Sequence, residues 1–150
     1  MAGTDMPLAR LLEHLDRLAQ KALALWDIPA NASATLINVS ENATYLVKAD
    51  GGFRAILRVH RESYHTRRAI ECELAWINAL DRDKVVVTPG HYRGRDGQAI
   101  QSCTIDGLDA PRFLVLFEFV EGAQPDETGY LTAPFEQLGA MAARMHLHAM

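Results

Sequence analysis

Apolar residues recur at three- and four-residue intervals along the first part of the chain. They are Leu8, Leu11, Leu12, Leu15, Leu18, Ala22 and Trp26. This spacing predicts an amphipathic helix, with Asp5 as its cap and Pro7 in its first turn. The helix is expected to end before Pro29, because proline cannot continue a regular helical ladder.

The pattern then changes to short runs of β-forming residues. Residues 35–39, 43–49 and 53–60 have this character, and two polar segments separate them. Residues 40–42 join the first two runs. Asp50-Gly51-Gly52 joins the second pair, and glycine supplies the positive φ angles that tight hairpin turns require. Three antiparallel strands joined by two hairpins are therefore predicted.

Helical periodicity returns over residues 67–80, and two further strands are predicted at about 99–105 and 112–119. A polar linker follows Gly122. The last helix is expected over residues 135–148. Strands gathered in one layer, with separate helices, indicate an α+β fold containing one antiparallel sheet of about five strands.

Two charged residues fall at positions that face a predicted core. Side chains alternate between the faces of a strand, so Arg58 shares a face with Ile56 and His60. In the following helix, Glu73 lies on the stripe formed by Ile70, Ile77 and Leu80. An unpaired ion in a low-dielectric core is costly, which favours an Arg58–Glu73 ion pair. In the alternative, Glu73 tilts to the helix edge and Arg58 extends to water.

The order of these elements resembles the N-terminal lobe of protein kinases. That plan has a strand hairpin, a third strand with a cation, a helix with a glutamate, two more strands and a connector. Residues 41–47, 56–61, 70–76 and 116–122 together resemble the aminoglycoside phosphotransferase and homoserine kinase type family. The resemblance covers about residues 30 to 148.

The resemblance implies how the chain is divided. Residues 1–29 are the N-terminal helical extension, and residues 30–122 are the kinase-like lobe, with a hinge at 118–122. Residues 123–150 are the linker and first helix towards a second lobe. The family binds Mg²⁺ through a His-Gly-Asp loop and a later Asp, which would lie after residue 150. The expected activity is transfer of the ATP γ-phosphate to a small-molecule hydroxyl, with no turnover by residues 1–150 alone.

By the same resemblance, Arg58 stands where kinases place the lysine that holds the α- and β-phosphates, and Glu73 stands at its helix partner. Arginine instead of lysine is a departure from the kinase pattern. Arginine nevertheless keeps its charge and binds phosphate oxygens in a bidentate manner. The segment Ser40-Glu41-Asn42 occupies the place of a glycine-rich loop without containing glycine. Contacts from Ser40 or Asn42 are expected to substitute, and a plain polar turn is the alternative.

The connector, residues 118–122 at the hinge, is expected to bind the adenine base through its backbone. The resemblance implies that the Glu118 carbonyl accepts a hydrogen bond from the adenine amino group, while the Val120 amide donates to the ring. Ile56, two residues before Arg58 on the same face, is expected to provide an apolar surface against adenine. The alternative for Ile56 is an ordinary core position.

Composition narrows the classes of function. The chain has 150 residues, of which 49% are hydrophobic and 23% charged, as expected for one globular unit. A net charge of −4 gives no basic footprint for nucleic acid, and no apolar run approaches the roughly 20 residues of a membrane span.

No secretory signal is recognised, so a cytoplasmic protein is expected. Basic residues cluster over 60–68, a run typical of a solvated surface. Cys72 and Cys103 show no metal-binding spacing.

The acceptor stays open, because aminoglycosides, homoserine, choline and other hydroxyl compounds all suit the family. A different class of function also competes with the enzyme. In this alternative, the chain is a free-standing lobe that acts as a regulatory or dimerising interaction module. An enzyme half is expected to expose an apolar face around the hinge and last helix, available for self-association, whereas a free-standing module would cover it.

Overall fold

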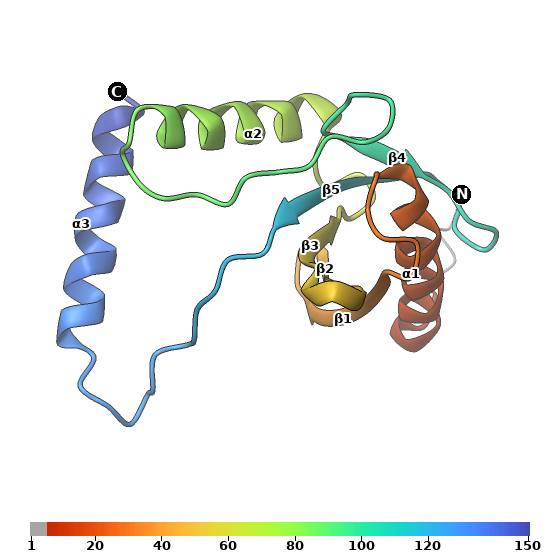
Figure 1. The fold of residues 1–150 in the computed structure, drawn as a ribbon, viewed down its shortest axis with the longest axis horizontal. Helices are drawn as coiled ribbons and strands as arrows, with labels where there is room; N and C mark the ends of the chain where they lie inside the picture. The colour runs from red at the N-terminus through yellow and green to blue at the C-terminus, as the bar shows by residue number, and fades with distance from the viewer. Residues whose placement is uncertain (1–5) are drawn as a thin grey trace.

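The computed structural model describes residues 6–150, and the expected cap Asp5 lies outside them (Figure 1). The elements in chain order are α1 (Leu8–Ala22), a 3-10 turn (Leu23–Leu25), β1 (Ser33–Val39), β2 (Ala43–Lys48), a second 3-10 turn (Asp50–Gly52), β3 (Arg54–Val59), α2 (Arg67–Arg82), β4 (Gln101–Cys103), β5 (Arg112–Glu118) and α3 (Thr132–His148). Among residues 6–150, no helix has both the length and the apolar character needed to cross a bilayer.

All five strands belong to one antiparallel sheet, in the order β1-β2-β3-β5-β4. The predicted α+β fold with a five-stranded antiparallel sheet is thus confirmed. In the turn between β2 and β3, Gly51 and Gly52 adopt φ angles of 78° and 83°, which residues with a side chain rarely adopt. The β1–β2 register shifts between Leu36 and Asn38, so that Ile37 bulges from the ladder.

Both faces of the sheet are covered. On one face, α1 buries Leu15, Leu18 and Ala22 against Tyr45 and Leu57 of the central strands. On the other face, α2 contributes Ile70 and Leu74 to a second cluster with Val115 and Phe117 of β5. Alternate residues of β5 therefore enter different cores, which explains why this strand is almost continuously apolar.

The strand predicted over residues 99–105 is shorter in the structure, because β4 pairs with β5 only over Gln101–Cys103. The ladder ends where Thr104 would pair with Pro111, which has no N–H to donate, and two cations of α1 bond to the backbone there. Lys21 Nζ donates to the carbonyl of Thr104 at 2.9 Å, and Arg17 Nη2 donates to the carbonyl of Asp106 at 3.0 Å. These side chains satisfy carbonyls that have no partner in the ladder.

The segment before β4 completes the sheet edge beside the end of β5. Tyr92 N donates to the Leu116 carbonyl at 2.8 Å, and Glu118 N donates to the Gly90 carbonyl at 2.9 Å. His91 forms a single bridge with Phe117 between these bonds. The last residues of β5 are therefore held on both sides before the chain leaves the sheet.

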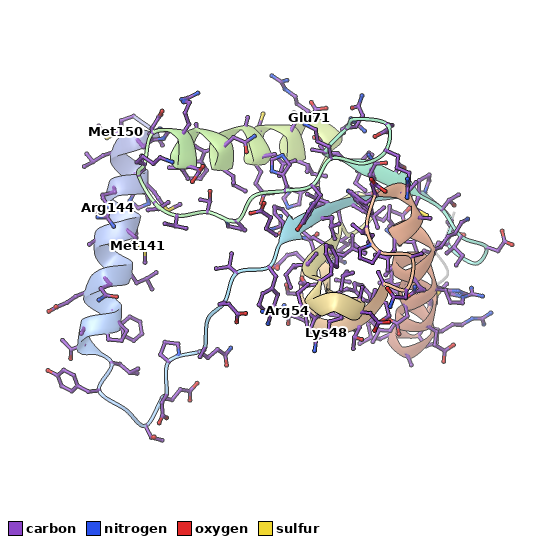
Figure 2. All side chains as sticks on the ribbon, viewed as in Figure 1. Lys48, Arg54, Glu71, Met141, Arg144 and Met150 are labelled. Carbon is purple, nitrogen blue, oxygen red and sulfur yellow. The ribbon has the colours of Figure 1, made fainter. Side chains whose placement is uncertain are left out.

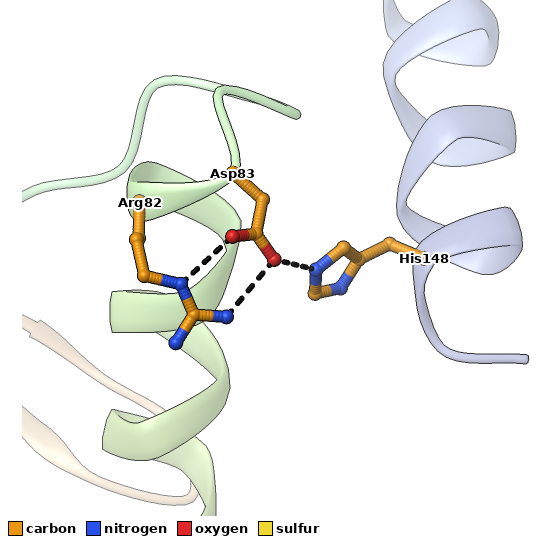
Figure 3. Close-up of polar contacts among 3 residues, drawn as sticks. All are labelled: Arg82, Asp83 and His148. Carbon is orange, nitrogen blue, oxygen red and sulfur yellow. Dashed lines mark hydrogen bonds and ion pairs between the residues drawn. The ribbon is translucent and has the colours of Figure 1, made fainter.

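The final helix stands apart from the sheet (Figure 1). It begins at Thr132, three residues before the predicted start, and Pro134 lies in its first turn, where a missing N–H costs little. None of its residues is buried. Within residues 6–150, its one side-chain hydrogen bond to the rest of the chain runs from His148 to Asp83 at the end of α2 (Figure 3).

Candidate functional site

The predicted ion pair between β3 and α2 is present. Arg58 Nη1 lies 2.7 Å from Glu73 Oε1. The guanidinium carbon of Arg58 also lies 4.8 Å from the ring centroid of Phe117, a cation–π distance. A side chain from each of two elements, α2 and β5, thus fixes the direction of the Arg58 head group.

The pair is half-buried and does not lie in a sealed core. The side chain of Arg58 is 29% exposed and that of Glu73 is 39% exposed. The buried stripe of α2 runs through Ile70, Leu74 and Leu80, so Glu73 lies beside the stripe and not on it. Full burial, the premise of the sequence argument, was therefore wrong for Glu73. Exposed N–H groups of the guanidinium are available to a ligand anion.

An apolar row crosses the sheet next to Arg58. The strand register places Leu46 beside Ile56, and Ile56 beside Phe117. Leu46 and Ile56 are only partly buried, although Ile56 also packs on the α2 core cluster. Ile56 therefore combines a core contact with a partly exposed apolar surface, as a flat aromatic ligand requires.

The turn between β1 and β2 lies further along the sheet, beside the end of β3. Asn42 Oδ1 accepts a hydrogen bond from the Arg61 amide at 3.2 Å, and the Ser40 amide donates to the Asn42 carbonyl at 3.0 Å. The amide oxygen of Asn42 is therefore occupied by backbone, and its NH₂ group is the part left for a ligand. Hydrogen bonds from the backbone amide of Glu41, and then from Ser40, lower the pKa of Glu41. Its negative charge at the turn disfavours a phosphate close to it.

The connector after β5 is open at the positions assigned to base binding. Glu118 is exposed, and Val120 is 58% exposed. Among residues 6–150, no protein group accepts a hydrogen bond from the Val120 amide. The Glu118 amide is bonded to Gly90, and its carbonyl, which points to the same side of the strand, receives no donor from that segment.

Sequence reasoning missed Arg54 as a residue that holds the connector. Its guanidinium carbon lies 4.3 Å from the Phe119 ring centroid, and Nη2 forms an ion pair with Glu121. Arg54 lies beside Lys48 at the end of the β2–β3 ladder (Figure 2). The available signal was the strand period, because Arg54 shares a face with Ile56 and Arg58. Arg54 thus ties the start of β3 to residues 119–121.

The described residues offer little for a metal ion. Residues 6–150 contain no group of three or more His, Cys, Asp or Glu side chains placed to bind one. Cys72 is exposed, Cys103 is partly buried, and neither is in a disulfide. The fit to a nucleotide is better, since Arg58 presents a half-exposed cation beside an apolar row and an open connector. The geometry suits a flat ring carrying a chain of phosphates.

Comparison with known proteins agrees with this geometry. The model of the phosphotransferase enzyme family matches residues 33–150. A search of curated protein sequences finds no match. A microcompartment-associated aminopropanol kinase is 46% identical, with a TM-score of 0.73 over 87% of this chain. An amicoumacin kinase, solved with AMP-PNP, Ca²⁺ and Ami, has a TM-score of 0.70 over 95% of this chain at 20% identity, and supports the fold alone. The chain spans 39% and 40% of the lengths of these two kinases.

Proposed function

The chain belongs to the phosphotransferase enzyme family, and we propose that it is the ATP-binding lobe of a kinase that transfers the γ-phosphate to a hydroxyl of a small molecule. The observation that carries the proposal is the half-exposed Arg58, held by Glu73 and Phe117. A fixed cation with free N–H groups is suited to phosphate oxygens, because little side-chain entropy is lost when the anion binds.

The remaining site residues take roles around this cation. Ile56 contacts the adenine ring, the Glu118 carbonyl accepts from the adenine amino group, and the Val120 amide donates to the ring. The exposed Ser40 and the NH₂ group of Asn42 contribute at the phosphate end. Arg54 positions the connector by holding Phe119 and Glu121.

The proposal divides the chain as the family resemblance implied. Residues 30–122 form the nucleotide lobe with the hinge at 118–122, residues 1–29 are its helical extension, and residues 123–150 lead to a second lobe. Mg²⁺ supplies charge neutralisation for the phosphates when it is bound, and its ligands belong to the second lobe. We assign the protein to the cytoplasm.

The acceptor proposed first is a small amino alcohol. The support is the 46% identity to an aminopropanol kinase, across 87% of this chain. Most contacts to the acceptor would come from the second lobe, so the residues described here select the nucleotide more than the acceptor.

The free-standing interaction module is the weaker candidate. Such a module would cover its apolar surface, yet α3 has no buried residue and exposes Phe135 and Leu138. The exposed apolar residues of α3 favour the interpretation of the chain as one lobe of an enzyme.

The 150-residue chain alone is expected to show no ATP-dependent phosphorylation of an amino alcohol. Positioning of the acceptor and metal ligation supply most of the rate in phosphoryl transfer, and residues 6–150 hold no metal-ligand cluster. A coupled assay for ADP release, with and without acceptor, checks this. Acceptor-dependent turnover by the pure chain would contradict the assignment of catalysis to a second lobe.

Arg58→Ala is the direct test, made on the protein as its gene encodes it. ATP binding is expected to weaken by about tenfold or more, since a charge-assisted hydrogen bond contributes about 1.5–3 kcal/mol. Adenosine binding is expected to stay nearly unchanged, because the connector contacts the base. Calorimetric titration of both ligands against both proteins measures the difference.

Two further variants make the result specific. Arg58→Lys keeps the charge and is expected to retain more ATP affinity than Arg58→Ala. Arg67→Ala removes another ion-paired arginine, bonded to Glu71 at 3.1 Å, and is expected to leave both ligands unaffected. Equal losses of ATP and adenosine affinity in a cooperatively melting Arg58→Ala protein would show that Arg58 is structural.

A further inference from the structure

Two basic side chains are buried where β3 ends and β5 begins. His60 is 2% exposed and Arg112 is 7% exposed. Both line a hollow of about 190 Å³ between the segment after β3 and the segment before β5. Arg58 does not line this hollow, whose rim at Arg61 adjoins the turn between β1 and β2 through the Arg61 amide bond to Asn42.

Three polar atoms of these side chains have no hydrogen-bond partner among the described residues. His60 Nδ1 lies 3.1 Å from the Phe113 carbonyl, while its Nε2 has no partner. Arg112 Nη1 is 3.2 Å from a carboxylate oxygen of Glu62, but the two do not align as a hydrogen bond. Arg112 Nε is also buried without a partner. A buried guanidinium with unmade hydrogen bonds costs stability unless an acceptor reaches it.

Arginines outnumber carboxylates in the lining, and burial lowers the pKa of His60, which favours its neutral form. Arg61 and His65 line it together with the hydroxyl-bearing Ser63, and Glu62 is the single acidic residue in the lining. Burial lowers the pKa of Arg112, and the nearby carboxylates of Glu62 and Asp109 act in the opposite direction. Glu62 has a side chain 42% exposed, so it can leave Arg112 for solvent at small cost. The basic run taken from sequence as a solvated surface therefore converges, in part, on one cavity.

We propose that this hollow binds a small anion of phosphate type, which takes the place of Glu62 on Arg112 and is also held by Arg61 and Ser63. The same chemistry is offered by inorganic phosphate and by the phosphate of a small phosphomonoester. The contacts that define this site involve Arg112, Glu62 and His60 but not Arg58, although Arg61 also adjoins Asn42 of the proposed ATP site.

The test is an NMR titration of the 150-residue chain with inorganic phosphate, and separately with glycerol phosphate, at ionic strength held constant with chloride. Saturable shifts are expected at the amides of residues 61–65 and 112–113. Tighter binding of glycerol phosphate identifies a phosphomonoester site, and equal binding identifies a phosphate site. Shifts that do not saturate, or that centre on Arg58, would overturn the proposal.

Glu62→Gln is the decisive variant, because it removes the competing carboxylate without emptying a core position. Its dissociation constant for phosphate is expected to fall by about two- to fivefold, the range for a partly exposed ion pair. Glu71→Gln is the matched control. Glu71 is 44% exposed in its pair with Arg67, and the variant is expected to leave phosphate binding unchanged. An unchanged dissociation constant in Glu62→Gln, or an equal change in Glu71→Gln, would contradict the site.

Arg112→Gln tests the buried cation itself. Provided its spectrum keeps native dispersion, phosphate binding is expected to weaken by about tenfold or more. Unchanged affinity in the folded variant would overturn the proposal. If the variant unfolds, Glu62→Gln and its control decide the question.

Discussion

Arg58 is held by contacts that contribute little to stability and much to orientation. Both members of the Arg58–Glu73 pair are partly in solvent, where screening and side-chain entropy reduce the gain from an ion pair. The Phe117 ring restricts the guanidinium from a second direction. An arginine fixed in this way, without being sealed, is prepared for an incoming anion more than it supports the fold.

A double-mutant cycle on Arg58→Ala and Glu73→Gln tests this view through the free energy of unfolding. The coupling energy is expected to be about 0.2–1 kcal/mol, the range for partly exposed pairs. Urea denaturation of the two single variants and the double variant gives the value.

The pair Arg67–Glu71 on α2 serves as the reference cycle, since it is of similar exposure and local to one helix. Its coupling is expected at about 0.3–0.5 kcal/mol. A coupling above about 2 kcal/mol for Arg58–Glu73 would mean that the pair behaves as a buried structural bridge. No coupling would mean that the contact is not populated in solution.

At the scale of elements, α1 is a layer of the domain and not a loose appendage. Its side chains bond to the backbone of the sheet as well as packing on it. Gln20 Nε2 donates to the Ala32 carbonyl at 3.0 Å, and Gln20 Oε1 accepts from the Ala34 amide at 3.1 Å. The Tyr45 hydroxyl donates to Asp16 at 2.9 Å. One helix thus fixes the entry of β1, an edge strand.

Gln20→Ala is expected to destabilise the fold by about 1–2 kcal/mol, because two side-chain hydrogen bonds to the edge backbone are lost. Gln137→Ala is the control, on the exposed α3, where Gln137 has no hydrogen bond to the residues described. The control is expected to change stability by less than about 0.5 kcal/mol. Urea unfolding of both variants checks the difference, and equal effects would contradict the role of Gln20.

Local signals in the sequence were sufficient to predict the strands and the hairpins that join them. Glycine at 51 and 52 set one turn, and strand alternation placed Ile56 and Arg58 on one face. The same periodicities left both the Arg58–Glu73 pair and its solvated alternative open, and the order of the elements favoured the pair that the structure contains. Contacts between distant segments were not predictable in this way. Lys21 and Arg17 of α1 bond to the backbone after β4, more than 80 positions later in the chain, at carbonyls that no local pattern marks.

The same limit explains what was missed around the candidate site. Arg54 holds the connector only because β3 pairs with β5, which brings residues 67 positions apart together. His60 and Arg112 meet for the same reason, since the His60 amide bonds to the Phe113 carbonyl at 2.9 Å. Both the contact of Arg54 with the connector and the approach of His60 to Arg112 depend on the order of strands in the sheet. No signal within the strands themselves predicted the order β3-β5-β4.

At the scale of the whole molecule, α3 is joined to the sheet-bearing part by a linker and by one polar contact. His148 Nε2 lies 2.8 Å from Asp83 Oδ2, and Asp83 is also bonded by Arg82 (Figure 3). Hydrogen bonds from Arg82, and then from His148, hold the pKa of Asp83 well below its usual range. Side chains radiate from all sides of α3, and none of its residues is buried (Figure 2).

This arrangement predicts that the 150-residue chain self-associates through α3. Phe135 and Leu138 are 63% and 56% exposed on that helix, and burying such residues against a second copy removes apolar surface from water. Leu138→Glu is expected to weaken association by about fivefold or more, because a charge would have to enter the contact. Sedimentation velocity over a concentration series measures the dissociation constant.

Ile37→Glu is the matched control for this prediction. Ile37 is 55% exposed, nearly the same as Leu138, but it lies on the edge strand β1 and not on α3. If α3 is the contact, the control associates as the unaltered chain does, because its new charge stays in water. If Ile37→Glu weakens association as much as Leu138→Glu, or weakens it alone, the contact involves the open edge of the sheet, where unpaired strand groups also favour association. A chain that stays monomeric at every concentration would show that the exposed apolar residues of α3 are too few to hold two copies together.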